Sequence, residues 1–312
     1  MNNSKTVVLA GASGFIGRYF RTRFERDGWQ VRTIGRTDRT GTGTGPDTRS
    51  PTARWGDDDG LTRALNGADL LVNLAGRSVN CRYNAGNRVQ ILGSRVATTA
   101  ELGRAVGRCS APPATWLNAS TGTIYRHAED APQSEQEGEL GEGFSVDVAK
   151  AWESALAGSE TPLTRRIPLR ISIVLGPGGG VMRPLGNLAR LGLGGPMGSG
   201  SQKFSWVHVE DLYRSVLFVH QRTDITGPVN VASPDVVDNR ELMRLVRRAC
   251  GARFGAPTPV WLLELGAVLI RTETELVLKS RWVQPRKLLD AGFIFRHAEL
   301  GSTLQDIMRR TA

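Results

Sequence analysis

Residues Thr6–Gly17 read TVVLAGASGFIG, and this stretch decides the fold. Thr6–Ala10 is apolar, β-branched and too short for a helix, so we expect a buried parallel strand. Gly11, Gly14 and Gly17 follow at the spacing of a turn that leads from a strand directly into a helix. Glycine allows a tight turn, close approach of backbone N–H groups to a pyrophosphate, and close packing of helix on strand. The stretch therefore predicts a dinucleotide-binding turn; a glycine turn in an α/β domain without a ligand is the alternative.

The residues after the turn complete a βαβ unit. Phe15–Asp27 is amphipathic, Gly28 ends it, and Gln30–Ile34 reads as a second strand. Strand and helix patterns then alternate, which is typical of a doubly wound parallel sheet. The further strands expected are 69–73, 115–119, 169–175, 204–207 and 229–231, and the further helices are 60–66, 88–106, 144–158, 182–193, 212–221, 239–250, 261–270, 273–278 and 298–310.

The end of the second strand indicates which cofactor the turn binds. NAD sites usually place an acidic residue there for the ribose 2′-OH, whereas NADP sites replace it and add an arginine for the 2′-phosphate. Here Gly35 and Arg36 follow the strand and no acid is present. The sequence favours NADP(H); the alternative is that Arg36 is a surface residue. Residues 37–54 lack apolar periodicity and are expected to form a mobile loop.

Length and composition exclude several classes of protein. The chain has 312 residues, and no apolar run approaches the ~20 residues of a membrane span. The N-terminus has no signal-peptide pattern, so we expect a soluble, cytoplasmic protein. We also expect a monomer or a homodimer. Three scattered cysteines and four histidines without ligand spacing predict neither a disulfide framework nor a metal site.

The net charge of +10 raises the question of nucleic-acid binding. The basic residues are mostly arginines spread along the chain, without a dense tract interleaved with aromatic residues. We therefore expect a solvated basic surface and no nucleic-acid partner. Some of the arginines that give the net positive charge are expected to bind the phosphates of a cofactor.

Two strand ends supply candidate site residues. The small residues of Leu74-Ala75-Gly76 follow strand 69–73 and would let a cofactor lie against the backbone. The hydroxyl-rich segment Ser120–Tyr125 follows strand 115–119, at the sheet edge where open α/β sheets place their chemistry. Cys81 and Tyr83 lie in a polar loop that should border the same edge; a plain loop role is the alternative.

At this point the chain resembles the extended short-chain dehydrogenase/reductases, and within them an atypical epimerase-like branch often labelled cell-division-inhibitor-like. The resemblance covers almost the whole chain. It rests on the order and spacing of Gly11-x-x-Gly14-Phe15-Ile16-Gly17, Asn73-Leu74-Ala75-Gly76, Ser94-Arg95-Val96-x-Thr98-Thr99, Trp152-Glu153, Arg170-x-x-x-Val174-Leu175-Gly176, Gly194-Gly195-Pro196-x-Gly198-Ser199-Gly200-x-Gln202, Phe204-Ser205-Trp206-Val207-His208, Gly227-Pro228-Val229-Asn230, Asn239-Arg240 and Pro285-x-x-Leu288-x-x-Ala291-Gly292-Phe293-x-Phe295.

The resemblance implies a Rossmann-type doubly wound parallel sheet with a small C-terminal substrate-binding domain. The expected NADP(H) domain is 1–176 with 204–232, and the smaller, mostly helical domain is 177–203 with 233–312. The residues implied to bind NADP(H) are Gly11, Ser13, Gly14, Phe15, Ile16, Gly35, Arg36, Leu74, Ala75, Gln90, Arg95 and Val174, to which the strand-end argument adds Gly76. The position of Arg95 on a helix beside the turn also predicts that its guanidinium binds phosphate oxygens. The alternative is that Arg95 is an exposed helix residue without this role.

One departure from the family matters for the chemistry. Its enzymes usually carry Tyr-x-x-x-Lys, in which the phenol exchanges a proton with the substrate while hydride moves to or from the nicotinamide. Placing Lys150 on the lysine puts Val146 where tyrosine should be, and aligning on Glu153 instead puts Ser145 there. The motif's serine is better matched by Thr121, with Ser120 beside it and Tyr125 four residues on.

Three functions remain open. The first is an NADP(H)-dependent oxidoreductase that reduces a carbonyl or enone of a small hydrophobic or aromatic metabolite, with another group as proton donor: Tyr125, Tyr83, Cys81, Lys150 or a water. The second is a non-catalytic NADPH-binding regulator, and the third is a nucleotide-sugar epimerase or dehydratase. The candidate catalytic residues are Thr121, Ser120, Tyr125 and Lys150, and the candidate substrate-pocket residues are Cys81, Tyr83, Met182 and Trp206, with a structural role favoured for Trp206.

Overall fold

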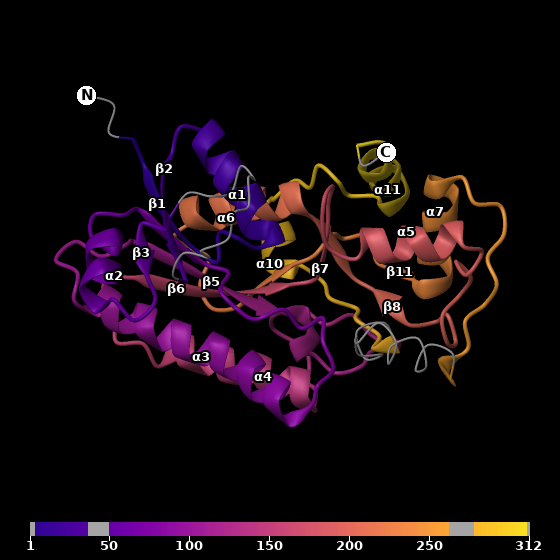
Figure 1. Cartoon of the computed structure of the whole chain (residues 1–312), viewed down its shortest axis with the longest axis horizontal. Helices are drawn as coiled ribbons and strands as arrows, with labels where there is room; N and C mark the ends of the chain where they lie inside the picture. The colour runs from indigo at the N-terminus through magenta and orange to yellow at the C-terminus, as the bar shows by residue number, and fades with distance from the viewer. Residues whose placement is uncertain (1–3, 37–49, 262–277, 311–312) are drawn as a thin grey trace.

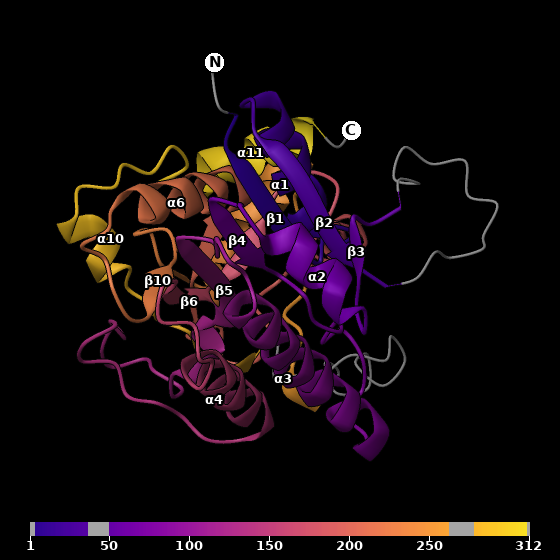
Figure 2. The ribbon, with the colours of Figure 1, turned by 90° about the vertical axis from the view of Figure 1, so that its left-hand side faces the viewer.

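The computed structural model describes residues 4–36, 50–261 and 278–310. Within these residues, seven strands form one parallel sheet in the order β10-β6-β5-β4-β1-β2-β3. Helices cover both faces, so the predicted α/β doubly wound fold is confirmed (Figures 1 and 2). The strands of this sheet are β1 (Thr6–Ala10), β2 (Gln30–Gly35), β3 (Ala53–Arg54), β4 (Leu70–Asn73), β5 (Thr115–Thr121), β6 (Arg165–Ile171) and β10 (Val229–Val231).

The opening stretch lies at the centre of the sheet. All five residues of β1 are buried, and β1 pairs with β2 on one side and β4 on the other. The strand order changes direction between β1 and β4, and ligands of open α/β sheets bind at the carboxyl edge of such a switch point. The glycine turn after β1 therefore occupies the position expected of a cofactor site.

Each face of the sheet has its own apolar core. On one face, α1 (Phe15–Arg26) and α6 (Val209–Gln221) bury Phe20, Phe24 and Tyr213, with α10 (Arg286–Asp290) beside them. On the other face lie α2 (Asp58–Leu65), α3 (Ala85–Gly107) and α4 (Phe144–Ala157), which cover residues such as Trp116. Figure 2 shows α3 and α4 on one side of the strands and α6 on the other.

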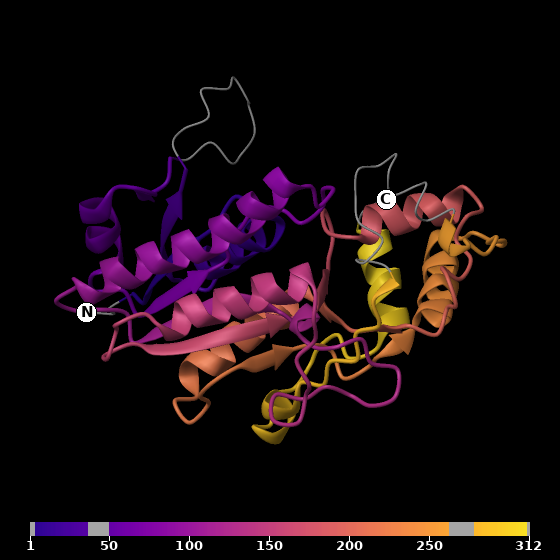
Figure 3. The same ribbon diagram turned by 90° about the horizontal axis from the view of Figure 1, so that it is seen from below.

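A second lobe packs beside the carboxyl edge of the sheet (Figure 3). Leu175 and Trp206 belong to its apolar core, which is distinct from the two sheet cores. The elements of this lobe are β7 (Ile173–Leu175), α5 (Met182–Arg190), β8 (Lys203–Phe204), β9 (Trp206–His208), β11 (Val237–Asp238), α7 (Asn239–Cys250) and α11 (Leu300–Arg309). The domain boundaries drawn from the sequence stay a prediction.

Several details differ from the expected elements. The strand predicted over 204–207 divides into β8, which pairs with β11, and β9, which pairs with β7. The strand predicted over 169–175 divides at Ser172, because the amide of Ser172 donates to Val231 O in the main sheet and that of Ile173 donates to Ser205 O near β9. The stretch read as loop up to Arg54 ends in the short edge strand β3. Most of helices 261–270 and 273–278 and of loop 37–54 lies outside the described residues.

Candidate functional site

The turn after β1 is built so that only glycine fits at two positions. Gly11 has φ +83°, and a Cβ there would lie 2.7 Å from the carbonyl carbon of Leu74. A Cβ on Gly17 would overlap the carbonyl oxygen of Gly11 and lie 2.7 Å from Ala12 Cα. Helix α1 begins after Gly14 without a side-chain cap, which leaves its N-terminal amides directed at the carboxyl edge. This is the geometry that holds a pyrophosphate.

A buried amide fixes the neighbouring backbone at the end of β4. Asn73 Nδ2 donates to Asn118 Oδ1 at 2.7 Å and to Thr99 Oγ1 at 3.3 Å, and its Oδ1 accepts from the amide of Ala75 at 3.0 Å. The side chain thus joins β4, β5 and α3. It holds the backbone of Leu74 where the close approach to Gly11 requires it.

Arg95 lies directly against this strand end. Its guanidinium stacks on the Trp152 ring at 5.0 Å and donates to the carbonyl oxygens of Arg77 and Ile91. A Cβ on Gly76 would lie 3.1 Å from Arg95 Cζ, so glycine at 76 leaves room for the guanidinium. Burial lowers the pKa of Arg95. The expected phosphate contact stays a prediction, since the described contacts of Arg95 are to carbonyl groups and an aromatic ring.

The other candidate cofactor residues lie around the same edge. Arg36 is exposed directly after β2, where Gly35 and Arg36, the last described residues before position 50, carry no carboxylate. Ser13 and Gly14 are exposed in the turn, Phe15, Ile16 and Gly35 are partly buried, Gln90 is exposed on α3, and Val174 pairs with Val207 in the β7–β9 ladder.

Two of the four candidate catalytic side chains are enclosed in a buried network. Ser120 Oγ donates to Glu153 Oε1 at 2.7 Å, and Arg170 donates to both oxygens of the same carboxylate at 2.9 Å. Arg170 Nη1 also donates to the Tyr125 hydroxyl at 2.9 Å, which in turn donates to Asn230 Oδ1 at 2.9 Å.

This network argues against Tyr125 as the proton donor. The residue is only 2% exposed, its hydroxyl proton is already donated, and burial raises the pKa of the phenol. Ser120 is 5% exposed and held by Glu153. Both side chains join strands and helices, which is a structural role that spacing alone did not reveal.

Helix α4 supplies a lysine but no phenol. Lys150 Nζ donates to the carbonyl oxygen of Gly141 at 2.9 Å, in the segment that leads into α4. Of the two residues aligned with the tyrosine of the motif, Val146 is fully buried and Ser145 is partly buried. Lys150 therefore remains the only half-buried ionisable candidate of the four.

Thr121 is partly exposed and is hydrogen-bonded to a second hydroxyl group. Its hydroxyl donates to Thr123 Oγ1 at 3.1 Å, and Arg281 Nε donates to the same Thr123 oxygen at 3.1 Å. Lys279 Nζ donates to the Thr123 carbonyl at 2.8 Å. Arg281 and Lys279 were missed from the sequence, because they lie more than 150 residues away and carry no motif of their own.

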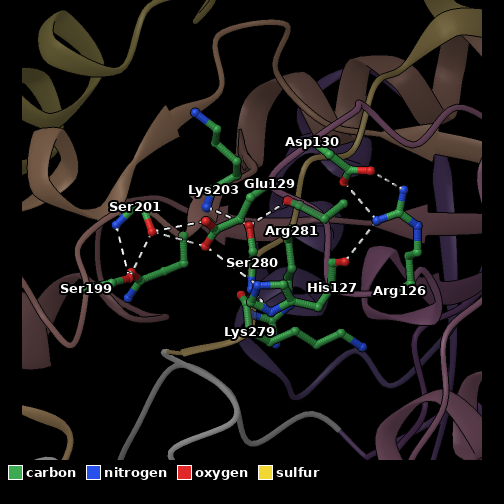
Figure 4. A network of polar contacts seen from close by, with 12 residues as sticks. Arg126, His127, Glu129, Asp130, Ser199, Ser201, Lys203, Lys279, Ser280 and Arg281 are labelled. Carbon is green, nitrogen blue, oxygen red and sulfur yellow. Dashed lines mark hydrogen bonds and ion pairs between the residues drawn. The ribbon is translucent and has the colours of Figure 1, made fainter.

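A polar cluster holds this arginine-bearing segment against the loop after β5 (Figure 4). The amide of Ser280 donates to His127 Nδ1 at 3.2 Å, and the Ser280 hydroxyl donates to the Ala128 carbonyl at 2.6 Å. The same hydroxyl accepts from the amide of Lys203 at 2.8 Å. Segments 126–130, 199–203 and 279–281 thus meet beside the end of β5.

The candidate substrate-pocket residues divide into two pairs. Tyr83 packs edge-on against Phe144 at 5.0 Å at the start of α4, and Cys81 lies two residues away with partial exposure. Met182 and Trp206 are 4% and 0% exposed in the core of the second lobe, and the Trp206 indole donates to the Asp235 carbonyl. Packing accounts for this second pair, whereas a pocket role for the first stays a prediction.

Among residues 4–36, 50–261 and 278–310, no group of three or more His, Cys, Asp or Glu side chains is arranged to hold a metal ion. The helices in these same ranges are also too short or too polar to cross a membrane.

Residues 7–232 match the model of the NAD dependent epimerase/dehydratase family. The chain belongs to this family. Residues 258–307 of this family member match a second model, described as a domain of unknown function (DUF1731). The two matches together cover both the glycine turn and the segment that carries Arg281.

Several relatives of this epimerase-family chain are similar over nearly its full length. The Bos taurus epimerase family protein SDR39U1 is 32% identical over 97% of this chain and 99% of its own length. A crystal structure of human SDR39U1 (isoform2) with NADPH has a TM-score of 0.85 at 29% identity, covering 97% and 99% of the two chains. A nucleoside-diphosphate sugar epimerase from Corynebacterium glutamicum has a TM-score of 0.75 at 25% identity, covering 99% of this chain and 59% of that one.

Proposed function

We propose that this chain is an NADP(H)-dependent oxidoreductase that reduces a carbonyl or enone group of a small hydrophobic or aromatic metabolite. The observation that carries the proposal is the hydrogen-bonded row of Thr121, Thr123 and Arg281 at the carboxyl end of β5. That end lies on the same edge of the parallel sheet as the glycine turn. We infer that a bound nicotinamide and a substrate meet beside this partly exposed hydroxyl, which is linked to a guanidinium.

The residues present fit NADP(H). The first-turn amides of α1 and the glycines at 11 and 17 suit the pyrophosphate, and the exposed guanidinium of Arg36 suits the 2′-phosphate. The human relative crystallised with NADPH supports the same cofactor. When bound, NADPH supplies the hydride for a reduction.

The hydroxyl row can stabilise negative charge on a substrate oxygen. Hydroxyl groups rotate, so Thr123 can turn its proton to Thr121 while it keeps accepting from Arg281, and the Thr121 proton is then free to point at a substrate oxygen. A guanidinium at the far end polarises such a row and strengthens its last donor. Thr121 would donate to the oxyanion that forms as hydride arrives, and water would supply the proton that completes the alcohol.

The test is consumption of NADPH by purified protein with a panel of ketones, quinones and enones. We expect Thr121→Val to lower kcat about 10²-fold or more, the usual effect of removing an oxyanion donor, with NADPH affinity unchanged. Thr62→Val is the control, because the Thr62 hydroxyl donates to a helix carbonyl in α2, remote from the site. Unchanged turnover in Thr121→Val would remove this hydroxyl from the mechanism.

The second candidate is a regulator that binds NADPH without turnover. It is favoured by the enclosed Tyr125, and by Val146 or Ser145 standing where the family's enzymes usually carry the phenol. NADPH binding without consumption across the whole panel would support it over the reductase. Conversion of a nucleotide sugar such as UDP-glucose, tested in the same assay series, would instead support epimerase or dehydratase chemistry.

A further inference from the structure

A cavity of about 570 Å³ lies on the far side of α1 from the sheet. The side chains that α1 contributes are at positions 15, 18, 19, 22, 23 and 26. This spacing marks one helical face. The core-facing residues Gly17, Phe20 and Phe24 lie on the opposite face. The remaining wall is formed by Pro177, Gly178, His208, Glu210, Arg296, His297 and Arg310.

The cavity has an excess of positive charge. Among the described residues that line it are five arginines and one carboxylate, that of Glu210. Both Arg23 and Arg296 approach the same oxygen, Oε1, of Glu210, at 3.3 and 3.4 Å, while the other oxygen accepts from the Tyr19 hydroxyl. One carboxylate therefore forms ion pairs with two guanidinium groups from different segments, and its single negative charge cannot neutralise both positive charges.

Two of the lining arginines have further ion-pair partners behind the cavity wall. Arg23 also approaches Asp27 at 3.8 Å, and Arg310 approaches Asp306 at 3.1 Å. Within the described part of the chain, the buried Nε of Arg23 has no hydrogen-bond acceptor. A concave surface with one sign of charge concentrates oppositely charged solutes.

The arrangement of the charges suits an extended anion. Arg18 and Arg26 are eight residues apart on one helix face, which corresponds to about 12 Å along the axis. A single phosphate cannot span that distance, whereas a chain of phosphates can. Guanidinium groups bind phosphate oxygens through paired, charge-assisted hydrogen bonds. Arg296 and Arg310 line the same cavity from outside α1, so guanidinium groups of separate segments could share one anion.

We propose that this cavity binds a small molecule that carries a chain of two or more phosphate groups, at a site separate from the cofactor turn. The ligand would bridge α1 of the sheet domain and α11 of the second lobe, because the arginines come from both. Some of the chain's many arginines would then bind a ligand rather than only form a solvated surface.

The test is calorimetric titration of the full chain with tripolyphosphate, in the presence of saturating NADPH so that the cofactor turn is filled. Arg26→Glu and Arg310→Glu, combined, alter two exposed lining residues without touching the Glu210 cluster. Arg244→Glu with Arg286→Glu is the matched control, since both are surface arginines in short-range ion pairs within a helix.

We expect wild-type protein and the control to bind tripolyphosphate, and the cavity variant to bind it at least about tenfold more weakly with an unchanged thermal midpoint. A tighter complex with ATP than with tripolyphosphate would support a nucleotide as the phosphate source, and equal affinities a simple phosphorylated compound. The proposal would be overturned if wild-type protein did not bind tripolyphosphate, or if both double variants lost affinity equally. It would also be overturned if a single-stranded oligonucleotide bound more tightly than either small probe.

Discussion

Replacing Gly17 by alanine should disrupt the turn around which the fold is built. The added Cβ would overlap the Gly11 carbonyl oxygen and lie 2.7 Å from Ala12 Cα and 2.9 Å from its carbonyl carbon. All three atoms belong to the backbone, so no side chain can rotate away. Overpacking of this kind costs about 1–3 kcal/mol, and alanine recovers about 0.5–1 kcal/mol of helix propensity. We expect a net loss of about 1–2 kcal/mol in the free energy of unfolding.

The matched control is Gly93→Ala in the middle of α3, where an added Cβ meets no atom within 4 Å. This variant should gain about 0.5–1 kcal/mol, because only the propensity term remains. Urea denaturation of both variants measures the difference, and fluorescence titration with NADPH should show weaker binding for Gly17→Ala alone. Equal stability and equal NADPH affinity in the two variants would refute the close-approach explanation of the glycine turn.

Three further predictions follow from single residues. Arg36→Ala should weaken NADPH binding at least about tenfold and leave NADH binding nearly unchanged, because only NADPH carries the 2′-phosphate; equal losses by titration would remove that assignment. Tyr125→Phe should lower the free energy of unfolding by about 1–2 kcal/mol, since two buried polar partners lose their hydroxyl, while turnover stays within about twofold; a large fall in kcat would return the phenol to the mechanism. Burial, and secondarily the stacked His297, lower the pKa of His208 to about 4, below the unfolded value of about 6.5. The protein should therefore lose about 2 kcal/mol of stability between pH 7 and pH 5 through this group; the same pH slope in His208→Gln would contradict this.

The first βαβ unit could be predicted from the sequence because its signals are local. Thr6–Ala10 is strand by its β-branched residues, and the following glycines lie where the chain must turn within a few residues. The break between β6 and β7 could not be predicted, since it depends on Ser172 and Ile173 finding different partners in space. A strand pattern is continuous across the break even though its pairing is not.

Catalytic candidates were harder to judge because spacing does not report burial. Tyr125 has the expected separation from Thr121, yet its role is set by Arg170 and Asn230, which are 45 and 105 residues away. The reverse holds for Arg281, which has no recognisable motif and still reaches Thr123 across 158 residues. Motif spacing predicts a candidate site at this strand end, but only tertiary contacts separate enclosed from accessible side chains there.

The row from Thr121 to Arg281 also bears on why the two matched regions occur in one chain. Thr121 and Thr123 lie in the part that matches the epimerase/dehydratase family, whereas Arg281 lies in the part that matches the domain of unknown function. The hydroxyl of Ser280 fixes this second part in place through a carbonyl after β5 and an amide at β8. If the guanidinium polarises the hydroxyl row as proposed, the C-terminal region contributes directly to the chemistry at the strand end. A family member that lacks the usual phenol would then obtain its electrostatic stabilisation from outside the Rossmann sheet, and activity would require both parts of the chain.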